Sequence, residues 1–177
     1  MVGFGSFSCS GKIDFMISPT GLLTDPPDIQ REVMLRDALT LIMRRKHPLA
    51  RRKALSLADL RDAQWVMPNA QTTMWRQVEA LFAAENEPWP IDCVTTDSIT
   101  ALTQLVMRSD CVSISSKKLV TLETRAGSIV CVPLRNPHFS REICLRQRRS
   151  AELQPVAQRF VVALRSVAAE LRKTGSK

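Results

Sequence analysis

Short apolar runs alternate with segments of helical periodicity along this chain, and this alternation limits most strongly the folds that it can adopt. The runs have the length of buried strands and end at Pro, Gly or polar residues. We expect strands at residues 13–17, 39–43, 65–67, 92–95, 111–114, 128–133 and 141–146. Strands joined by helices are typical of α/β proteins with a mostly parallel sheet, which is therefore the expected fold class.

Helices are expected where apolar residues recur every three or four positions. The buried stripe of the first long helix is expected to be Trp75, Val78, Leu81 and Phe82. A helix capped by residues 97–98 should bury Ile99, Leu102 and Val106. The last helix opens at Pro155, and its expected stripe is Val156, Phe160, Leu164, Val167 and Leu171. Before these, Ser56 and Asp59 have the spacing of a capping box ahead of a short helix.

The length and composition predict a folded protein. With 177 residues, 45% hydrophobic and 24% charged, the chain can form one domain or two small lobes. No apolar run reaches the roughly 20 residues that a membrane helix needs, and residues 1–12 lack the pattern of a signal peptide. We therefore expect a cytoplasmic protein without membrane contacts.

Cysteine and histidine usage argues against an enzyme or a metal centre. The five cysteines, which include Cys9, form no C-x-x-C pair. The other four lie in apolar runs, namely Cys93, Cys111, Cys131 and Cys144. There are two histidines, no glycine-rich phosphate loop and no recurring carboxylate pair. We therefore predict no enzymatic activity, no metal and no cofactor. A cysteine-dependent enzyme stays an alternative, which would require an exposed thiol of lowered pKa.

The net charge of +8 is unevenly distributed. Residues 44–54 carry +6 and residues 141–177 carry +6, whereas residues 55–110 carry −5. A basic surface attracts polyanions. However, aromatic residues make up only 5% of the chain, so the densest basic segment is interpreted as a solvated bend. A polyanion-binding module is the alternative, and it predicts steep salt dependence without sequence preference.

Polar residues follow three of the expected strands, at residues 18–20, 67–73 and 95–98. In open α/β sheets, ligands bind beyond the carboxyl ends of the strands, where helix N-termini favour anions. The same hydroxyl groups also serve as ordinary helix caps. The residues alone leave both interpretations open.

Several segments resemble one protein family. They are GKIDFMIS (residues 11–18), LTLIMRRKHPLARRK (39–53), LSLADLRDAQWVMP (55–68), the run from 95 to 120, and GSIVCVPL (127–134). In this order they are similar to the effector-binding domain of LysR-type transcriptional regulators. The resemblance covers about residues 11–173.

The resemblance implies an α/β, periplasmic-binding-protein-like (type 2) fold, in which two Rossmann-like lobes are joined by crossing strands. Lobe one would comprise residues 1–43 and 141–177, and lobe two residues 44–140. The family's DNA-binding domain, and the first strand and helix of lobe one, have no counterpart in this sequence. We therefore interpret the chain as an N-terminally truncated member, in which lobe two folds and lobe one is loose.

The family's function implies that a small effector, for which we expect a carboxylate, binds between the lobes and modulates transcription. By position, the effector contacts would be Ser18, Asn69, Gln71, Thr72, Thr73 and Thr96. Met67 and Trp75 could shape the pocket, although a core role suits Trp75 better. A homodimer or tetramer is expected, with DNA bound only through an N-terminal helix-turn-helix that this chain lacks. The alternatives are a stand-alone cytosolic solute-binding protein of the same fold and a non-functional fragment.

Overall fold

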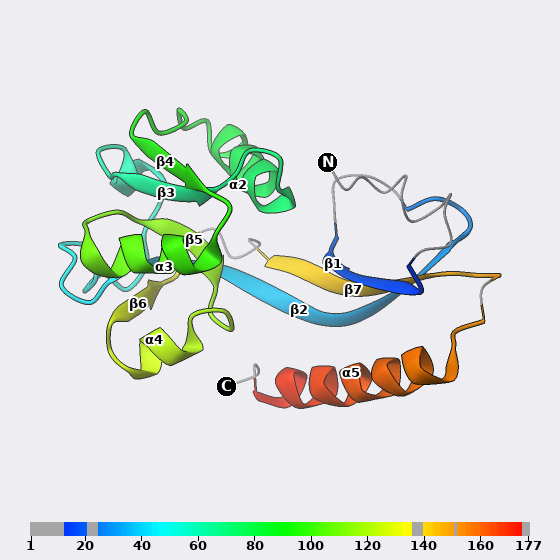
Figure 1. Ribbon diagram of the computed structural model, residues 1–177. Coiled ribbons are helices and arrows are strands. Elements are labelled where there is room, and N and C mark those ends of the chain that lie inside the picture. The colour runs from blue at the N-terminus through cyan, green and yellow to red at the C-terminus, as the bar shows by residue number, and fades with distance from the viewer. Residues whose placement is uncertain (1–12, 21–24, 136–139, 151, 175–177) are drawn as a thin grey trace. The chain divides into compact units, whose positions relative to one another are not determined.

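The computed structural model describes residues 13–20, 25–135, 140–150 and 152–174 (Figure 1). The chain divides into two compact units. Unit 1 is made of Met1–Asp37 and Arg141–Lys177, and unit 2 is Ala38–Ser140. Strand β2 (Ile29–Arg44) begins in unit 1 and ends in unit 2. None of the helices in the described ranges has the length and hydropathy that a bilayer crossing requires.

In unit 2, β2 is paired on both sides. Strands β5 (Ser113–Ser116) and β6 (Ile129–Val132) both run antiparallel to it, so that Leu41 lies opposite Ile114 on one side and Val132 on the other. Strands β3 (Trp65–Pro68) and β4 (Cys93–Thr96) form a parallel pair. A single parallel bridge from Trp65 to Val112 connects β3 with the segment that leads into β5.

Helices pack against both faces of β3. Successive residues of a strand point to opposite faces, so neighbouring β3 residues contact different helices. Trp65 and Met67 share a core cluster with Phe82 of helix α2 (Thr73–Ala84). Val66, between them, belongs to a second cluster with Leu102 of helix α3 (Ile99–Arg108). A fully buried aliphatic side chain contributes about 1.5–3 kcal/mol. These two clusters therefore hold β3 and both helices in place.

Local signals set the helix boundaries. The hydroxyl of Ser98 accepts a hydrogen bond from Ala101 N, as expected for its cap. Ser56 N and Oγ donate to Asp59 Oδ2 at 2.8 and 2.7 Å, ahead of the short 3-10 helix η1 (Ala58–Leu60). Asn86 follows α2 with a φ of 54°, a conformation in which Asn is tolerated better than most side chains. Helix α4 (Thr121–Arg125) completes unit 2.

Unit 1 consists of strands β1 (Phe15–Pro19) and β7 (Ser140–Arg148), the first part of β2, and helix α5 (Pro155–Thr174). β1 and β7 are antiparallel, and the strand order is β1-β7-β2. The buried cluster of this unit is Met34, Leu145, Val161 and Ala168. It contains fewer buried residues than either of the two core clusters of unit 2.

The expectation of a mostly parallel sheet is wrong. The pairs β1–β7, β2–β5 and β2–β6 are antiparallel, and β3–β4 is the parallel pair among the described registers. In unit 2 the difference arises because β5 and β6 both run antiparallel to β2. The strand expected at residues 39–43 is only the end of β2, since Arg31, Glu32, Arg36 and Asp37 interrupt the apolar pattern before that point.

The expected stripe of α5 is wrong at three of its five positions, whereas Leu164 packs against the buried cluster of unit 1 as expected and Leu171 is half-buried. Val156, Phe160 and Val167 are 78%, 58% and 51% exposed, whereas Ala157, Val161 and Ala168 are buried. Apolar residues occur on more than one face of this helix, so its pattern alone does not select the packed face. The same applies to Ile99 at the start of α3, which is 51% exposed.

Candidate functional site

The carboxyl ends of β3 and β4 lie side by side, with Pro68 paired to Thr96. Each strand continues through a short loop into a helix, β3 into α2 and β4 into α3. The first-turn N–H groups of a helix have no partner within its own hydrogen-bond ladder. This edge of unit 2 therefore presents two helix N-termini next to each other, which is an arrangement suited to a polar or anionic ligand.

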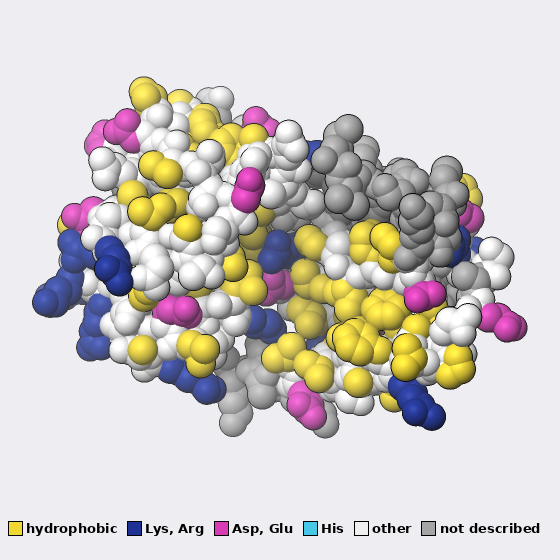
Figure 2. Space-filling view, in the orientation of Figure 1, with side chains coloured by type: hydrophobic (Ala, Val, Ile, Leu, Met, Phe, Trp, Pro, Cys, Tyr) yellow, Lys and Arg dark blue, Asp and Glu magenta, His cyan; other side chains and the backbone are white. Residues whose placement is uncertain are grey.

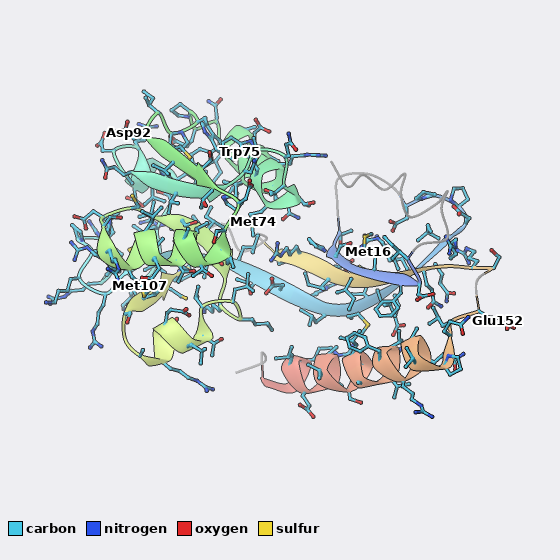
Figure 3. All side chains as sticks on the ribbon, in the orientation of Figure 1. Met16, Met74, Trp75, Asp92, Met107 and Glu152 are labelled. Atoms are coloured by element: carbon cyan, nitrogen blue, oxygen red, sulfur yellow. The ribbon has the colours of Figure 1, made fainter. Side chains whose placement is uncertain are left out.

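The loop after β3 is closed by its own side chains. Asn69 Oδ1 accepts from Gln71 N at 3.1 Å. The Thr72 hydroxyl donates to Asn69 O at 2.8 Å and accepts from Trp75 N at 3.2 Å, which makes Thr72 the N-cap of α2. These bonds fix where the first turn of α2 begins. Figure 3 shows Met74 and Trp75 at this end of the helix.

The loop after β4 is built similarly. Thr96 Oγ1 accepts from Ser98 N at 3.2 Å, and Ser98 in turn caps α3. Asn69, Thr72 and Thr96 therefore act as turn and cap residues in this structure. By contrast, the side chains of Gln71, which is exposed, and Thr73, which is half-buried, have no polar partner among the described residues. These two are the expected site residues whose side chains are free to bind a ligand.

Asp97 is a neighbour of this loop pair that sequence reasoning did not weigh as a site residue. Its Oδ2 lies 3.4 Å from Asn69 Nδ2. The exposed carboxylate stands directly before the N-terminus of α3, where it stabilises the helix dipole but repels a second anion. An anionic ligand is therefore favoured at the N-terminus of α2 over that of α3. The run T-T-D-S before a helical stripe was the signal that could have revealed it.

Ser18 belongs to unit 1, where its hydroxyl accepts from Arg146 Nη1 at 2.7 Å. Arg146 is 1% exposed and donates through Nε to Asp25 Oδ1, also at 2.7 Å. Ser18 is thus held in place by a buried ion pair. Arg146 was missed by the sequence reasoning, although a charged residue inside the apolar run at 143–146 was a signal. That Ser18 faces the loops of unit 2 stays a prediction.

Two apolar neighbours have core positions. Met67 is fully buried in the cluster under α2, and therefore cannot shape a ligand pocket as the resemblance suggested. The Trp75 ring packs on Trp89 with centroids 4.5 Å apart, and Trp89 contacts Phe82 at 5.2 Å. Trp75 is half-buried and supports the first turn of α2 from one side.

The cysteines of the described ranges are free thiols, namely Cys93, Cys111, Cys131 and Cys144, while Cys9 lies outside those ranges. Burial raises the pKa of the Cys93 and Cys131 thiols. A raised pKa lowers the thiolate fraction at neutral pH, which works against a nucleophilic role for these two residues.

Comparison with known proteins decides the family. The LysR substrate binding domain matches residues 9–169. The chain belongs to the LysR substrate-binding domain family. It is 27% identical over 162 residues to the HTH-type transcriptional regulator GalR of Pseudomonas putida, and 27% identical over 157 residues to the HTH-type transcriptional regulator GbpR of Azospirillum brasilense. These alignments cover 90% and 88% of this chain, but only 40% and 46% of the two relatives.

Solved LysR-type structures have the same fold. The effector-binding domain of QuiR, in complex with shikimate, matches 92% of this chain and 73% of that one, with a TM-score of 0.70 and 21% identity. The regulatory domain of CcmR from Synechocystis PCC6803, in complex with 2-PG, matches 89% and 74%, with a TM-score of 0.74 and 19% identity. The expected periplasmic-binding-protein-like type 2 fold is therefore confirmed.

Proposed function

We propose that this LysR substrate-binding domain is the effector-sensing portion of a transcriptional regulator, and that it binds a small carboxylate-bearing molecule. The observation that carries the proposal is the pair of adjacent strand ends at Pro68 and Thr96, each followed by a capped helix N-terminus. Family membership supports the same role, because the relatives matched over most of this chain are named as transcriptional regulators.

The proposed contacts are divided between side chains and backbone. The N–H groups in the first turn of α2 would receive the carboxylate, since the helix dipole favours negative charge there. Gln71 and Thr73 would add hydrogen bonds from side chains that have no other polar partner in the described ranges. Asn69, Thr72 and Thr96 would hold the loops in the binding geometry. Ser18 is the proposed contact from unit 1.

Two arguments favour a carboxylate as the ligand: the positive end of the helix dipole at α2, and the ligands of similar solved domains. QuiR and BenM were solved with shikimate and benzoate, which are both carboxylates. Their identity to this chain is 21% and 18%, so these two molecules serve here as probes of a ligand class and not as assigned effectors.

The remaining partners are proposed from the family. CbnR was solved as a full-length protein in complex with target DNA, and this chain covers 54% of that protein. We infer that transcriptional control by this chain involves a helix-turn-helix segment that binds DNA, a homodimeric or tetrameric assembly and a cytoplasmic location. We also infer that the domain senses its ligand without converting it.

Isothermal titration with a panel of carboxylates, which includes benzoate, shikimate and their neutral amides, tests the proposal. The carboxylates should bind and the amides should bind more weakly. The variants Gln71→Ala and Thr73→Val should each weaken binding about 10- to 150-fold, because one hydrogen bond to a charged group is worth about 1.5–3 kcal/mol. Gln104→Ala, an exposed change in the middle of α3, is the matched control and should leave affinity unchanged. Equal binding of acids and amides, or no effect of either variant, would contradict the proposal.

A further inference from the structure

Exposed cations gather around Arg45, at the end of β2 in unit 2. Three neighbouring hollows of about 610, 660 and 510 Å³ all include Arg45 in their walls. The cations that line them, here called the Arg45 face, are Arg44, Arg45, Lys46, Arg51, Arg108, Lys117 and Arg125. Figure 2 shows Lys and Arg side chains gathered along one side of unit 2.

The charge of the Arg45 face is largely uncompensated. Among the described residues, no Asp or Glu lines any of the three hollows. Arg44 is paired with Asp110, whose Oδ1 lies 2.6 Å from Nη2. The other six cations have no ion pair with the described residues. Closely spaced like charges without counter-charges create a strong positive potential, which favours a negatively charged partner.

Tertiary structure assembles this face from distant segments. Residues 44–51 form the bend that the sequence suggested was merely solvated, but Arg108 ends α3 and Arg125 ends α4. Arg45 is fixed at the centre, since its N–H donates to Ser128 O at 3.0 Å. Its guanidinium lies over Gly127, where a Cβ would come within 2.7 Å of Nη1. Gly127 therefore provides the space that Arg45 occupies.

The lining residues indicate which anion fits. The cations are spread over three hollows and four chain segments, which suits repeated charges along a polymer better than one small ion. No Phe or Trp of the described ranges lines the hollows, so unpaired bases would find no stacking platform there. The face therefore matches the phosphates of a duplex, which a protein contacts without reading sequence.

We propose that the Arg45 face binds the phosphate backbone of double-stranded DNA without sequence preference. The choice of DNA as the polyanion rests on the proposed function, since the named relatives are HTH-type regulators. A helix-turn-helix segment on the same protein would keep DNA nearby, and the Arg45 face would then add contacts outside the recognised site. This contact is separate from the strand ends proposed for the effector.

Fluorescence anisotropy of the full 177-residue chain with a labelled duplex of arbitrary sequence tests this proposal. Affinity should fall steeply with salt, and a second unrelated duplex should bind equally well. The double variant Arg45→Gln/Arg125→Gln should weaken binding at least about 10-fold at low salt. It should also reduce the slope of log affinity against log salt by about 2, since each lost phosphate contact removes about 1.

The matched control is Arg159→Gln/Arg172→Gln, which removes the same charge from exposed positions of α5. It should keep most of the affinity, and far-UV circular dichroism should show both variants folded. Titration of carboxylates on the same proteins separates the two proposals, because the Arg45 variant should leave that binding unchanged. The proposal is overturned if both double variants lose affinity equally, which indicates net charge alone. Binding to anionic phosphatidylserine vesicles but not to the duplex would also overturn it.

Discussion

The imidazole Nε2 of His47 lies 3.1 Å from the main-chain carbonyl oxygen of Asp110. The other ring nitrogen, Nδ1, accepts from Leu49 N at 3.1 Å. This pair of contacts suits a neutral ring that is protonated on Nε2, because a doubly protonated ring has no acceptor for the Leu49 N–H. His47 therefore joins the start of the basic bend to the loop before β5.

The free energy of unfolding should depend on the charge of His47. Burial lowers the pKa of His47 below its ordinary value of 6.5. Below about pH 6.5 the His47 side chain is therefore protonated to a greater extent in the unfolded chain than in the folded one, and its contribution to stability is lost as the pH drops towards the folded pKa. Urea unfolding at about pH 7.5 and about pH 5.5 measures this loss. His47→Gln should reduce the difference and His138→Gln should keep it; equal loss in both variants would contradict the prediction.

Breaking the buried pair between Arg146 and Asp25 should destabilise unit 1. Arg146→Met leaves Asp25 with an unpaired charge, and removal of one partner of a buried pair costs about 3–5 kcal/mol. The double variant Arg146→Met/Asp25→Leu should recover most of this loss, because no charge then stays buried. Denaturant unfolding of the three proteins measures both effects. A double variant as unstable as Arg146→Met would show that the cost comes from lost packing instead.

Removing either cap beside the candidate site should cost similar stability but differ in ligand binding. Thr72→Ala and Ser98→Ala each remove the side-chain acceptor at a helix N-terminus, which costs about 1 kcal/mol. Only Thr72→Ala should also weaken carboxylate binding, because the ligand is assigned to α2. Thermal unfolding and titration of both variants provide the comparison. Equal weakening by Ser98→Ala would place the ligand at both helix ends.

Neutralising Asp97 should strengthen carboxylate binding. The Asp97 carboxylate stands next to Asn69 at the strand ends and repels an anion there. Because the group is exposed and screened, Asp97→Asn should raise affinity only about 2- to 5-fold, equivalent to about 0.3–1 kcal/mol. The gain should shrink at high salt. Asp92→Asn, a charge removed from the opposite end of β4, is the control and should change affinity little.

Hydrogen exchange should be faster in unit 1 than in unit 2. The buried cluster of unit 1 is Met34, Leu145, Val161 and Ala168, and α5 leaves Phe160 and Val167 more than half exposed. Fewer buried apolar contacts give lower local opening free energies. Mass spectrometry should therefore find faster exchange in β1 and α5 than in β3 and α3. Uniformly slow exchange across both units would refute the prediction of a loose lobe one.

Elements of unit 2 with strong local signals could be predicted from the sequence. The helix stripe of Val78, Leu81 and Phe82 is buried as expected, and Ser98 caps its helix. The polar loops after β3 and β4 were recognised because each combines a strand end with a cap residue. Which of their side chains are free for a ligand could not be predicted, since that depends on hydrogen bonds such as those of Thr72.

Local periodicity and cap chemistry in the sequence by themselves determined the alternation of strands and helices, and the family pattern identified the fold. Tertiary structure decided the strand directions around β2, the buried face of α5 and the grouping of Arg45 with Arg108 and Arg125. The physical reason is the separation along the chain between the residues that interact. Caps and periodicity involve residues within a few positions of each other, whereas pairing, burial and surface potential depend on contacts between residues far apart in the chain.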